Sequence, residues 1–216
     1  PVTIGEGTTL YPNASVGFPG QDFKFKIGDP TAGVVIGKNC ILRESATVHA
    51  ATKPDKPTIV GDGVLMMTLS HVGHDARVDN RAIMVNGSAL GGHSHLGEAA
   101  TLSAYTCLHQ FGRAGRLSFA SSHVALSNDL PPFCLTVERG HMTGLNLVGL
   151  RRAGFAREEI TLLREVFRRA FRSHLTRDEI LEVLEERSKE SSAVKELYQF
   201  VLDKKRPICT GHRRWV

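Results

Sequence analysis

The sequence lacks any apolar run long enough to cross a bilayer, and aromatic residues make up only 6% of its 216 positions. No aromatic platform interleaves its basic residues, which argues against a surface for single-stranded nucleic acid. Residues 1–10 show neither the charged start nor the apolar core of a secretory signal. We therefore expect a cytoplasmic protein with no transmembrane segment and no nucleic-acid partner.

Cysteine is also scarce. Cys40, Cys107, Cys134 and Cys209 show no paired spacing, which disfavours a disulfide framework or a cysteine-based zinc site and indicates reduced thiols. The formal net charge of +5 is mild. It suits an acidic partner, such as a nucleotide diphosphate or an acidic carrier protein, and it is at least as compatible with an ordinary solvated surface.

What the sequence does contain is a six-residue repeat. Such a period cannot keep one face of an α-helix against a core, and a hexapeptide period is typical of a parallel β-helix. We therefore expect a mainly β solenoid. The apolar positions of the uninterrupted repeat are Val60, Met66, Val72, Val78, Met84, Leu90, Leu96, Leu102, Leu108, Ala114, Ala120 and Leu126.

The same repeat begins near the N-terminus, at Ile4, and is interrupted twice. Residues 19–33 and 51–57 are rich in glycine, proline and charge, so we expect two external loops there. Solenoids carry insertions on one face, often the binding face, which makes both loops candidate substrate contacts. No polar cap precedes the first hexad. This end is therefore expected either to lack coils that relatives have or to be covered in an oligomer.

Helix-forming residues replace the repeat in the last third of the chain. We expect a β-helix over residues 1–133, followed by a connecting segment and a C-terminal helical domain over 134–216. Apolar stripes with a 3.6-residue period indicate the helices, and Thr176 with Glu179 forms a capping box that opens one of them. The predicted helices span residues 156–173, 176–187 and 192–203.

Ten histidines are more than a solenoid needs. If three hexads form one coil, residues about 18 apart stack along one edge, so His74, His93 and His109 would line one groove. A neutral imidazole is suited to take a proton from a hydroxyl. Asp75 would orient the ring of His74 only at a coil corner, because adjacent strand residues point to opposite faces. Gly92 offers a bare backbone amide that can approach a reacting carbonyl.

Several motifs resemble the bacterial UDP-N-acetylglucosamine O-acyltransferases that take their acyl chain from acyl-carrier protein. The similarity covers essentially the whole chain, including its helical tail. Hexads alone are shared by many acyltransferases, whereas these motifs are specific in their order and separation. The matching stretches are Gln21–Lys24, Ile41–His49, Ser70–Asp75 (SHVGHD), Leu108–Phe111 (LHQF), Asp129–Phe133 (DLPPF) and Asn146–Phe155 (NLVGLRRAGF).

The resemblance implies a left-handed parallel β-helix, a homotrimer, and active sites in grooves between neighbouring subunits. It implies transfer of a (3-hydroxy)acyl chain from an acyl-carrier-protein thioester to the sugar 3-position of UDP-N-acetylglucosamine. That reaction is the first step of lipid A biosynthesis and uses no metal and no cofactor beyond the thioester co-substrate.

The same resemblance implies roles for individual residues. His74 would be the general base with Asp75 beside it, and the amide of Gly92 would serve the oxyanion. Asn146 and Arg152 would hold the nucleotide and its phosphates, where arginine suits bidentate contacts. The full set of implied substrate-binding residues is Gln21, Asp22, Lys24, His49, His71, His93, His109, Gln110, Ser122, His141, Asn146 and Arg152.

Three positions depart from the family pattern and leave alternatives open. Val148 and Ala153 replace an acidic and a basic residue in the nucleotide-binding segment. They motivate a second reading, in which the enzyme acylates a different nucleotide sugar, for instance by N-acylation or on a 3-amino sugar. Ser122 replaces a glycine at the floor of the acyl pocket, where a larger side chain should shorten the acceptable acyl chain.

Two further alternatives keep the solenoid and change its role. One is a zinc enzyme similar to the γ-type carbonic anhydrases, in which neighbouring subunits donate the histidines, with ligands drawn from His71, His74, His93 and His95. The other is a scaffold that has lost catalysis. The helical tail and the specific motifs favour the acyltransferase over both.

Overall fold

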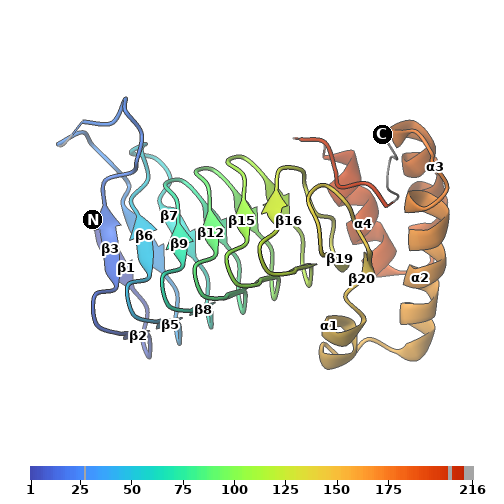
Figure 1. The fold of residues 1–216 in the computed structure, drawn as a ribbon, viewed down its shortest axis with the longest axis horizontal. Helices are drawn as coiled ribbons and strands as arrows, with labels where there is room; N and C mark the ends of the chain where they lie inside the picture. Colours follow the sequence, from blue (N-terminus) through green and yellow to red (C-terminus); the bar gives the residue numbers. More distant parts are fainter. Residues whose placement is uncertain (27, 204–205, 212–216) are drawn as a thin grey trace.

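The computed structural model describes residues 1–26, 28–203 and 206–211. Ile27, which falls in the first expected loop, lies outside the described residues. So do residues 204–205 and 212–216 of the expected C-terminal domain. Strands β1 to β18 wind through three sheets as a parallel β-helix, with helices at the end opposite the N-terminus (Figure 1). The predicted β solenoid with a C-terminal helical part is confirmed.

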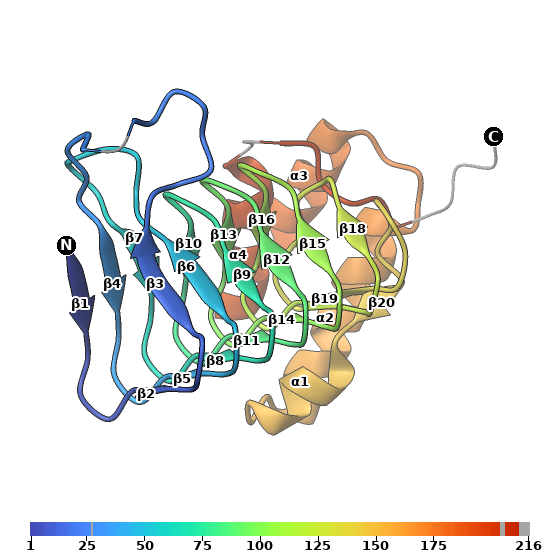
Figure 2. The same ribbon diagram turned by 60° about the vertical axis from the view of Figure 1, so that its left-hand side comes forward.

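Each coil contributes one strand to each sheet, and the strands of sheet C run side by side along the solenoid (Figure 2). Sheet A contains β1 (Val2–Ile4), β4 (Val34–Ile36), β7 (Thr58–Val60), β10 (Arg77–Val78), β13 (His95–Leu96) and β16 (Arg113–Ala114). Sheet B contains β2 (Thr9–Leu10), β5 (Ile41–Leu42), β8 (Leu65–Met66), β11 (Ile83–Met84), β14 (Thr101–Leu102), β17 (Phe119–Ala120), β19 (Cys134–Thr136) and β20 (Gly144–Leu145). Sheet C contains β3 (Ser15–Phe18), β6 (Thr47–His49), β9 (His71–Val72), β12 (Ala89–Leu90), β15 (Cys107–Leu108) and β18 (Ala125–Leu126).

The coil repeats every 18 residues wherever the hexads are uninterrupted, so that Val60 pairs with Val78. The spacing widens where the two loops are inserted. Val2 pairs with Val34, 32 residues further on, and Val34 pairs with Thr58, 24 residues further on. The loops therefore add their residues outside the coil, and the parallel pairing continues past them, with one register shift between Val16 and Phe18 in the pairing of β3 with β6.

The apolar hexad positions point inward and form the core. Met66 and Leu90 are fully buried. Small residues two positions before an apolar hexad position, such as Ser70 and Ser88, are fully buried as well. Each large apolar side chain buried in this way contributes roughly 1.5–3 kcal/mol relative to an exposed one. In the first coil Ile4, which also occupies an apolar hexad position, is 42% exposed.

Most corners of the solenoid use a residue with a left-handed backbone. On the corner between sheets C and A these residues are Asp75 (φ 58°), His93 (φ 59°) and Phe111 (φ 61°). The conformation costs a residue with a side chain about 1 kcal/mol or more, and it persists because the coils on either side fix it. It also ends the alternation of a strand, so neighbouring side chains at a corner can meet.

The helical region begins after β19, which extends sheet B in parallel, and β20, which pairs with β19 in the antiparallel sense. The three predicted helices are confirmed within a few residues, and Thr176 with Glu179 forms the predicted capping box. A short helix at the basic segment was not predicted. The helices are α1 (Leu147–Arg152), α2 (Arg157–Phe171), α3 (Arg177–Arg187) and α4 (Ser192–Leu202).

Two arginines of the solenoid hold α4 against the last coils. Arg113 donates from Nε to Oδ2 of the buried Asp129 over 2.7 Å and contacts Asp203 over 3.1 Å at the end of α4. Arg116 forms a two-pronged ion pair with Glu196 of α4, at 2.7 and 2.9 Å. Among the described helices, none is both long and apolar enough to cross a membrane.

Candidate active site

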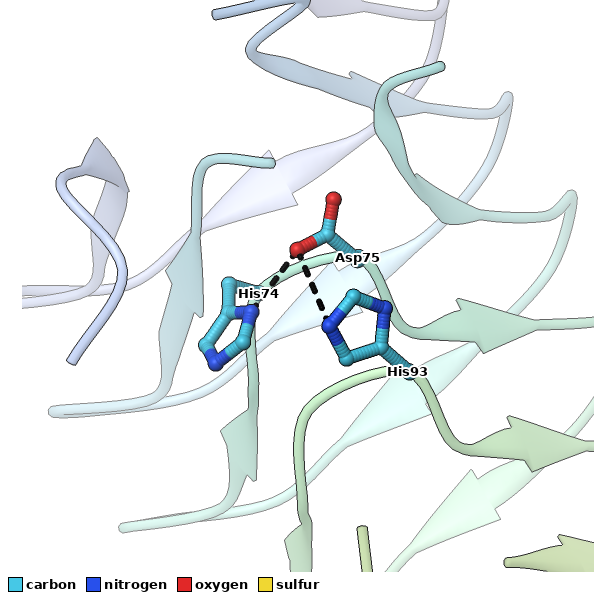
Figure 3. A group of neighbouring side chains, drawn as sticks. All are labelled: His74, Asp75 and His93. Atoms are coloured by element: carbon cyan, nitrogen blue, oxygen red, sulfur yellow. Dashed lines mark hydrogen bonds and ion pairs between the residues drawn. The ribbon is translucent and has the colours of Figure 1, made fainter. Parts of the chain in front are cut away.

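His74 and Asp75 meet at the corner between β9 and β10. The left-handed backbone of Asp75 turns its carboxylate toward the preceding ring, and His74 Nδ1 lies 2.7 Å from Asp75 Oδ2 (Figure 3). On a straight strand these side chains would point to opposite faces, so the contact depends on the corner. When Nδ1–H donates to the carboxylate, Nε2 keeps its lone pair. This is the arrangement of a histidine base oriented by a carboxylate.

The carboxylate of Asp75 stays ionised although it is largely buried. Burial raises its pKa, but hydrogen bonds from His74 and Thr52 outweigh burial and hold the pKa below its ordinary value. His93, one coil further on, directs Nε2 at the same oxygen from 3.7 Å (Figure 3). Burial lowers the pKa of His93, and the ring of Phe111 stacks on it with centroids 4.7 Å apart.

Two glycines leave room for the ring of His74. A β-carbon on Gly92 would lie 2.6 Å from both Cε1 and Nε2 of that ring, and one on Gly20 would lie 2.7 Å from Cβ of His74. The ring is therefore enclosed between the next coil and the first external loop. Within the described residues, the amide N–H of Gly92 has no protein acceptor. A free amide thus lies beside the nitrogen that would act as base.

A groove of about 360 Å³ runs along sheet C in front of His74. Burial disfavours the charged form of two histidines in this groove, His71 and His49, by lowering their pKa values. Burial lowers the pKa of His71 to about 4, helped by the neighbouring His49 and His74, and burial also lowers the pKa of His49. The residues lining the groove are Gln21, His49, His71, Gly73, His74, Ala89, Leu90, Gly91, Gly92, Cys107, Leu108, His109 and Gln110.

The first external loop brings one of its expected residues into this groove. Gln21 lines it, whereas Asp22 and Lys24 form a small exposed turn in which the Lys24 amide donates to Asp22 Oδ1 over 2.9 Å. The charge of Asp22 acts to raise the pKa of His93, against the larger effect of burial. The loop thus brings the negative charge of Asp22 close enough to act on the ring of His93.

Asn146 and Arg152 lie at a different groove, of about 630 Å³, together with Val148 and Ala153. Asn146 caps α1 by accepting from the Gly149 amide over 2.9 Å, and Arg152 is exposed in the last turn of that helix. A single chain therefore does not bring these two residues to His74.

Ser122 and His141 are also outside the histidine groove. Ser122 lies on the corner between sheets B and C, with its Oγ 3.0 Å from Ser103 Oγ. His141 follows β19, and its Nδ1 lies 2.9 Å from Thr210 Oγ1.

The four histidines considered as zinc ligands do not converge. His95 lies on sheet A, where its Nε2 is 2.7 Å from Asp79 Oδ2, and His71 Nδ1 is 2.7 Å from Thr47 Oγ1. Within one chain this ligand set does not come together, because the strand positions of His71 and His95 belong to different sheets. Only His74 and His93 meet, and Asp75 joins them in a triad whose potential ligand atoms all lie within 4.8 Å.

Three residues of the site were not predicted. Thr52 bonds the Asp75 carboxylate, Gly20 packs on His74, and Phe111 stacks on His93. The 18-residue register was a usable signal for Phe111, which follows His93 by one coil. No sequence signal indicated the other two, since they belong to loops without a repeat.

Known proteins with similar sequences share this architecture. A family model described as UDP N-acetylglucosamine O-acyltransferase, domain 2, matches residues 129–209. The acyl-[acyl-carrier-protein]–UDP-N-acetylglucosamine O-acyltransferase of Stutzerimonas stutzeri is 38% identical over 86% of this chain and 72% of its own length. A protein of the same name from Pseudomonas putida is 35% identical over 92% and 77%, respectively.

Solved structures agree with the sequence relatives. The UDP-N-acetylglucosamine acyltransferase of Francisella novicida superposes with a TM-score of 0.89 at 32% identity, over 96% of this chain and 78% of its own. The enzyme of Bacteroides fragilis gives the same TM-score and identity, over 96% and 81%. These enzymes are left-handed parallel β-helices, and the predicted handedness is confirmed.

A left-handed β-helix with a histidine–carboxylate pair on its edge and a C-terminal helical part defines an acyltransferase of the hexapeptide-repeat class. The sequence relatives, at 38% and 35% identity over most of the chain, identify the family within that class. The chain belongs to the UDP-N-acetylglucosamine O-acyltransferase family.

Proposed function

We propose that this protein transfers an acyl chain from an acyl-carrier-protein thioester to the 3-hydroxyl of UDP-N-acetylglucosamine, the first step of lipid A biosynthesis. One observation carries the proposal at the level of chemistry. The His74–Asp75 pair lies against Gly92, whose amide has no acceptor among the described residues, within one groove. A base and an oxyanion donor side by side are what acyl transfer to a hydroxyl requires.

In this reaction His74 Nε2 removes the proton of the sugar hydroxyl while its oxygen attacks the thioester carbonyl. The carbonyl oxygen becomes an oxyanion and accepts a hydrogen bond from the amide of Gly92. The tetrahedral intermediate then collapses and its C–S bond breaks. The protonated ring gives its proton to the departing sulfur, which leaves a 3-O-acyl sugar nucleotide and a free carrier-protein thiol.

Asp75 supports two stages of this cycle. Its carboxylate holds the ring in the Nδ1–H tautomer before the attack, and it stabilises the imidazolium that forms during the attack. Because the pKa of Asp75 lies below its ordinary value, the carboxylate remains charged at neutral pH and can serve in both stages.

We propose that the enzyme works as a homotrimer in the cytoplasm. The separation of Asn146 and Arg152 from the histidine groove supports the oligomer, because a neighbouring subunit would supply a nucleotide site that one chain does not complete. Light scattering coupled to size exclusion tests the trimer. A monomer that retains full activity would contradict it.

The decisive experiment is a thiol-release assay with acyl-carrier-protein donors of several chain lengths. We expect release that depends on UDP-N-acetylglucosamine, and mass spectrometry should find the O-acylated sugar nucleotide. If Ser122 closes the acyl pocket, shorter donors should be preferred. Failure of every donor to react in the presence of the sugar nucleotide would overturn the proposed function.

A second acceptor has support from the groove beside α1. Val148 is 55% exposed there and Ala153 lines the same wall, so this wall offers apolar contacts next to Arg152. A different nucleotide sugar, including one with an amine acceptor, suits such a wall. Binding measurements across UDP- and dTDP-sugars separate the two candidates, since the tightest ligand identifies the acceptor.

A further inference from the structure

The second external loop reaches the catalytic pair through Thr52. Its hydroxyl donates to Asp75 Oδ2 over 2.7 Å, and its backbone N–H lies 3.1 and 3.2 Å from the two carboxylate oxygens. The same Oδ2 accepts from His74 Nδ1. Thr52 therefore fixes the carboxylate by two donors, its hydroxyl and its amide. The same carboxylate accepts the hydrogen bond of the His74 ring.

The far end of the same loop holds the backbone of Asp75. Thr58, the first residue after the loop, accepts a hydrogen bond of 2.8 Å from the Asp75 amide at its Oγ1. Both ends of the insertion thus contact Asp75. Thr52 binds its side chain, and Thr58 binds its main chain. The side chain of Asp75 is only 10% exposed in this enclosure.

The first external loop braces the second. Thr31 bonds the carbonyl of Ala51 through its hydroxyl, and the amide of Ala51 donates to Gly33 over 3.1 Å. The first of these contacts holds the peptide group between Ala51 and Thr52, whose N–H donates to the carboxylate on its other side. The position of Thr52 is therefore determined by loop residues that have no direct contact with Asp75.

We propose that Thr52 is a positioning residue for the catalytic pair, and that the second loop is inserted in the solenoid in order to deliver it. The inference rests on the proposed function. A threonine that fixes Asp75 fixes the acceptor for Nδ1–H, and so it selects the His74 tautomer in which Nε2 is free. Without the hydroxyl the carboxylate keeps one weaker anchor, the Thr52 amide, and the ring samples the other tautomer.

The test compares Thr52→Val with Thr52→Ser in the full chain. Valine keeps the shape and the backbone donor but loses the hydroxyl, so we expect kcat to fall roughly 10- to 100-fold with little change in KM. Serine restores the donor and should recover most of the activity. Imidazole ¹⁵N shifts of His74 provide the second readout: they should report Nδ1–H alone in the wild type and mixed tautomers in the valine variant.

Thr143→Val is the matched control, because it removes a threonine hydroxyl that donates to the carbonyl of Leu135 over 3.1 Å, beside β19 and away from both loops. It should keep the wild-type tautomer and nearly the wild-type kcat. Equal losses in both valine variants, or an unchanged His74 tautomer in Thr52→Val, would overturn the positioning role. The tautomer is measured without substrate, so an enzyme that fails to transfer acyl groups would refute the proposed function and leave this result standing.

Discussion

Asp75 and His93 occupy the same corner of two successive coils, and Asp75 Oδ2 lies 3.7 Å from His93 Nε2. The carboxylate thus stands between a ring of its own coil, His74, and a ring of the next. One anion serves two imidazoles because the left-handed corner turns the carboxylate toward His74 and the 18-residue register stacks His93 on it.

Replacing the base should separate catalysis from folding. His74→Ala removes the group that takes the hydroxyl proton, and we expect acyl transfer to fall by about 10² or more while the trimer remains intact. His95→Ala is the matched control, because His95 also bonds a carboxylate, Asp79, but lies on sheet A. Full activity in His74→Ala would refute the assignment of the base.

Adding one methyl group at Gly92 should disable the same base. The new β-carbon would lie 2.6 Å from the His74 ring, so the ring must move away from the amide that receives the oxyanion. We expect Gly92→Ala to lower kcat by roughly tenfold or more, in line with the loss of one well-placed group. Gly144→Ala, which adds its methyl group to open space, should have no effect on turnover.

The buried histidine His71 should make stability depend on pH. In the unfolded chain its pKa is about 6.5, and burial lowers it to about 4 in the native state. Between these values the unfolded state binds more protons, so native stability is complete above about pH 6.5 and declines as pH falls toward 4.

Denaturant midpoints at about pH 7.5 and pH 5 measure this difference for the wild type. His71→Gln cannot take up the proton and should show a smaller drop between the two conditions. An equal drop in both proteins would assign the acid sensitivity to other groups, of which His49 and His93 have pKa values lowered by burial as well.

The ion pair between Arg113 and Asp129 should be costly to break from one side. Asp129 is fully buried, and burial raises its pKa although the hydrogen bonds from Arg113 oppose that effect. Arg113→Met leaves this carboxyl without its partner, so we expect a loss of about 3–5 kcal/mol in the free energy of unfolding.

Two comparisons make the ion-pair prediction specific. Combining Arg113→Met with Asp129→Asn should destabilise less than Arg113→Met alone, because no unpaired charge stays buried. Arg81 pairs with Glu98 at the surface, and Arg81→Met should change stability by less than about 1 kcal/mol. If Arg113→Met and Arg81→Met lowered the free energy of unfolding by similar amounts, burial of the Arg113–Asp129 pair would not be the cause of the loss.

Chelation should leave the proposed reaction intact. The mechanism needs a base and an amide, so acyl transfer by protein dialysed against EDTA should equal that of untreated protein. Metal analysis of the purified protein completes the test. Stoichiometric zinc, together with activity that is lost on chelation and restored by the metal, would revive a metal enzyme built on His74, Asp75 and His93.

The coil and its core were predictable because a six-residue apolar period has one regular solution. The corners were harder, since Asp75 and His93 hold left-handed conformations that propensity would assign to glycine or asparagine. Thr52 was not predictable at all. It belongs to an insertion, and only the way in which the loop folds back on the coil brings it to the carboxylate. The helix α1 was missed because it is too short for an apolar stripe to show.

Because His74 comes from one coil and Gly92 from the next, no single repeat contains a working site. Catalysis therefore reports on the contact between those two coils. In a solenoid, where each repeat is stabilised mainly by its neighbours, opening can be local rather than global. Under gradually stronger denaturant, acyl transfer should vanish at the concentration at which these coils part, while spectroscopic signals from the helices still register a folded protein.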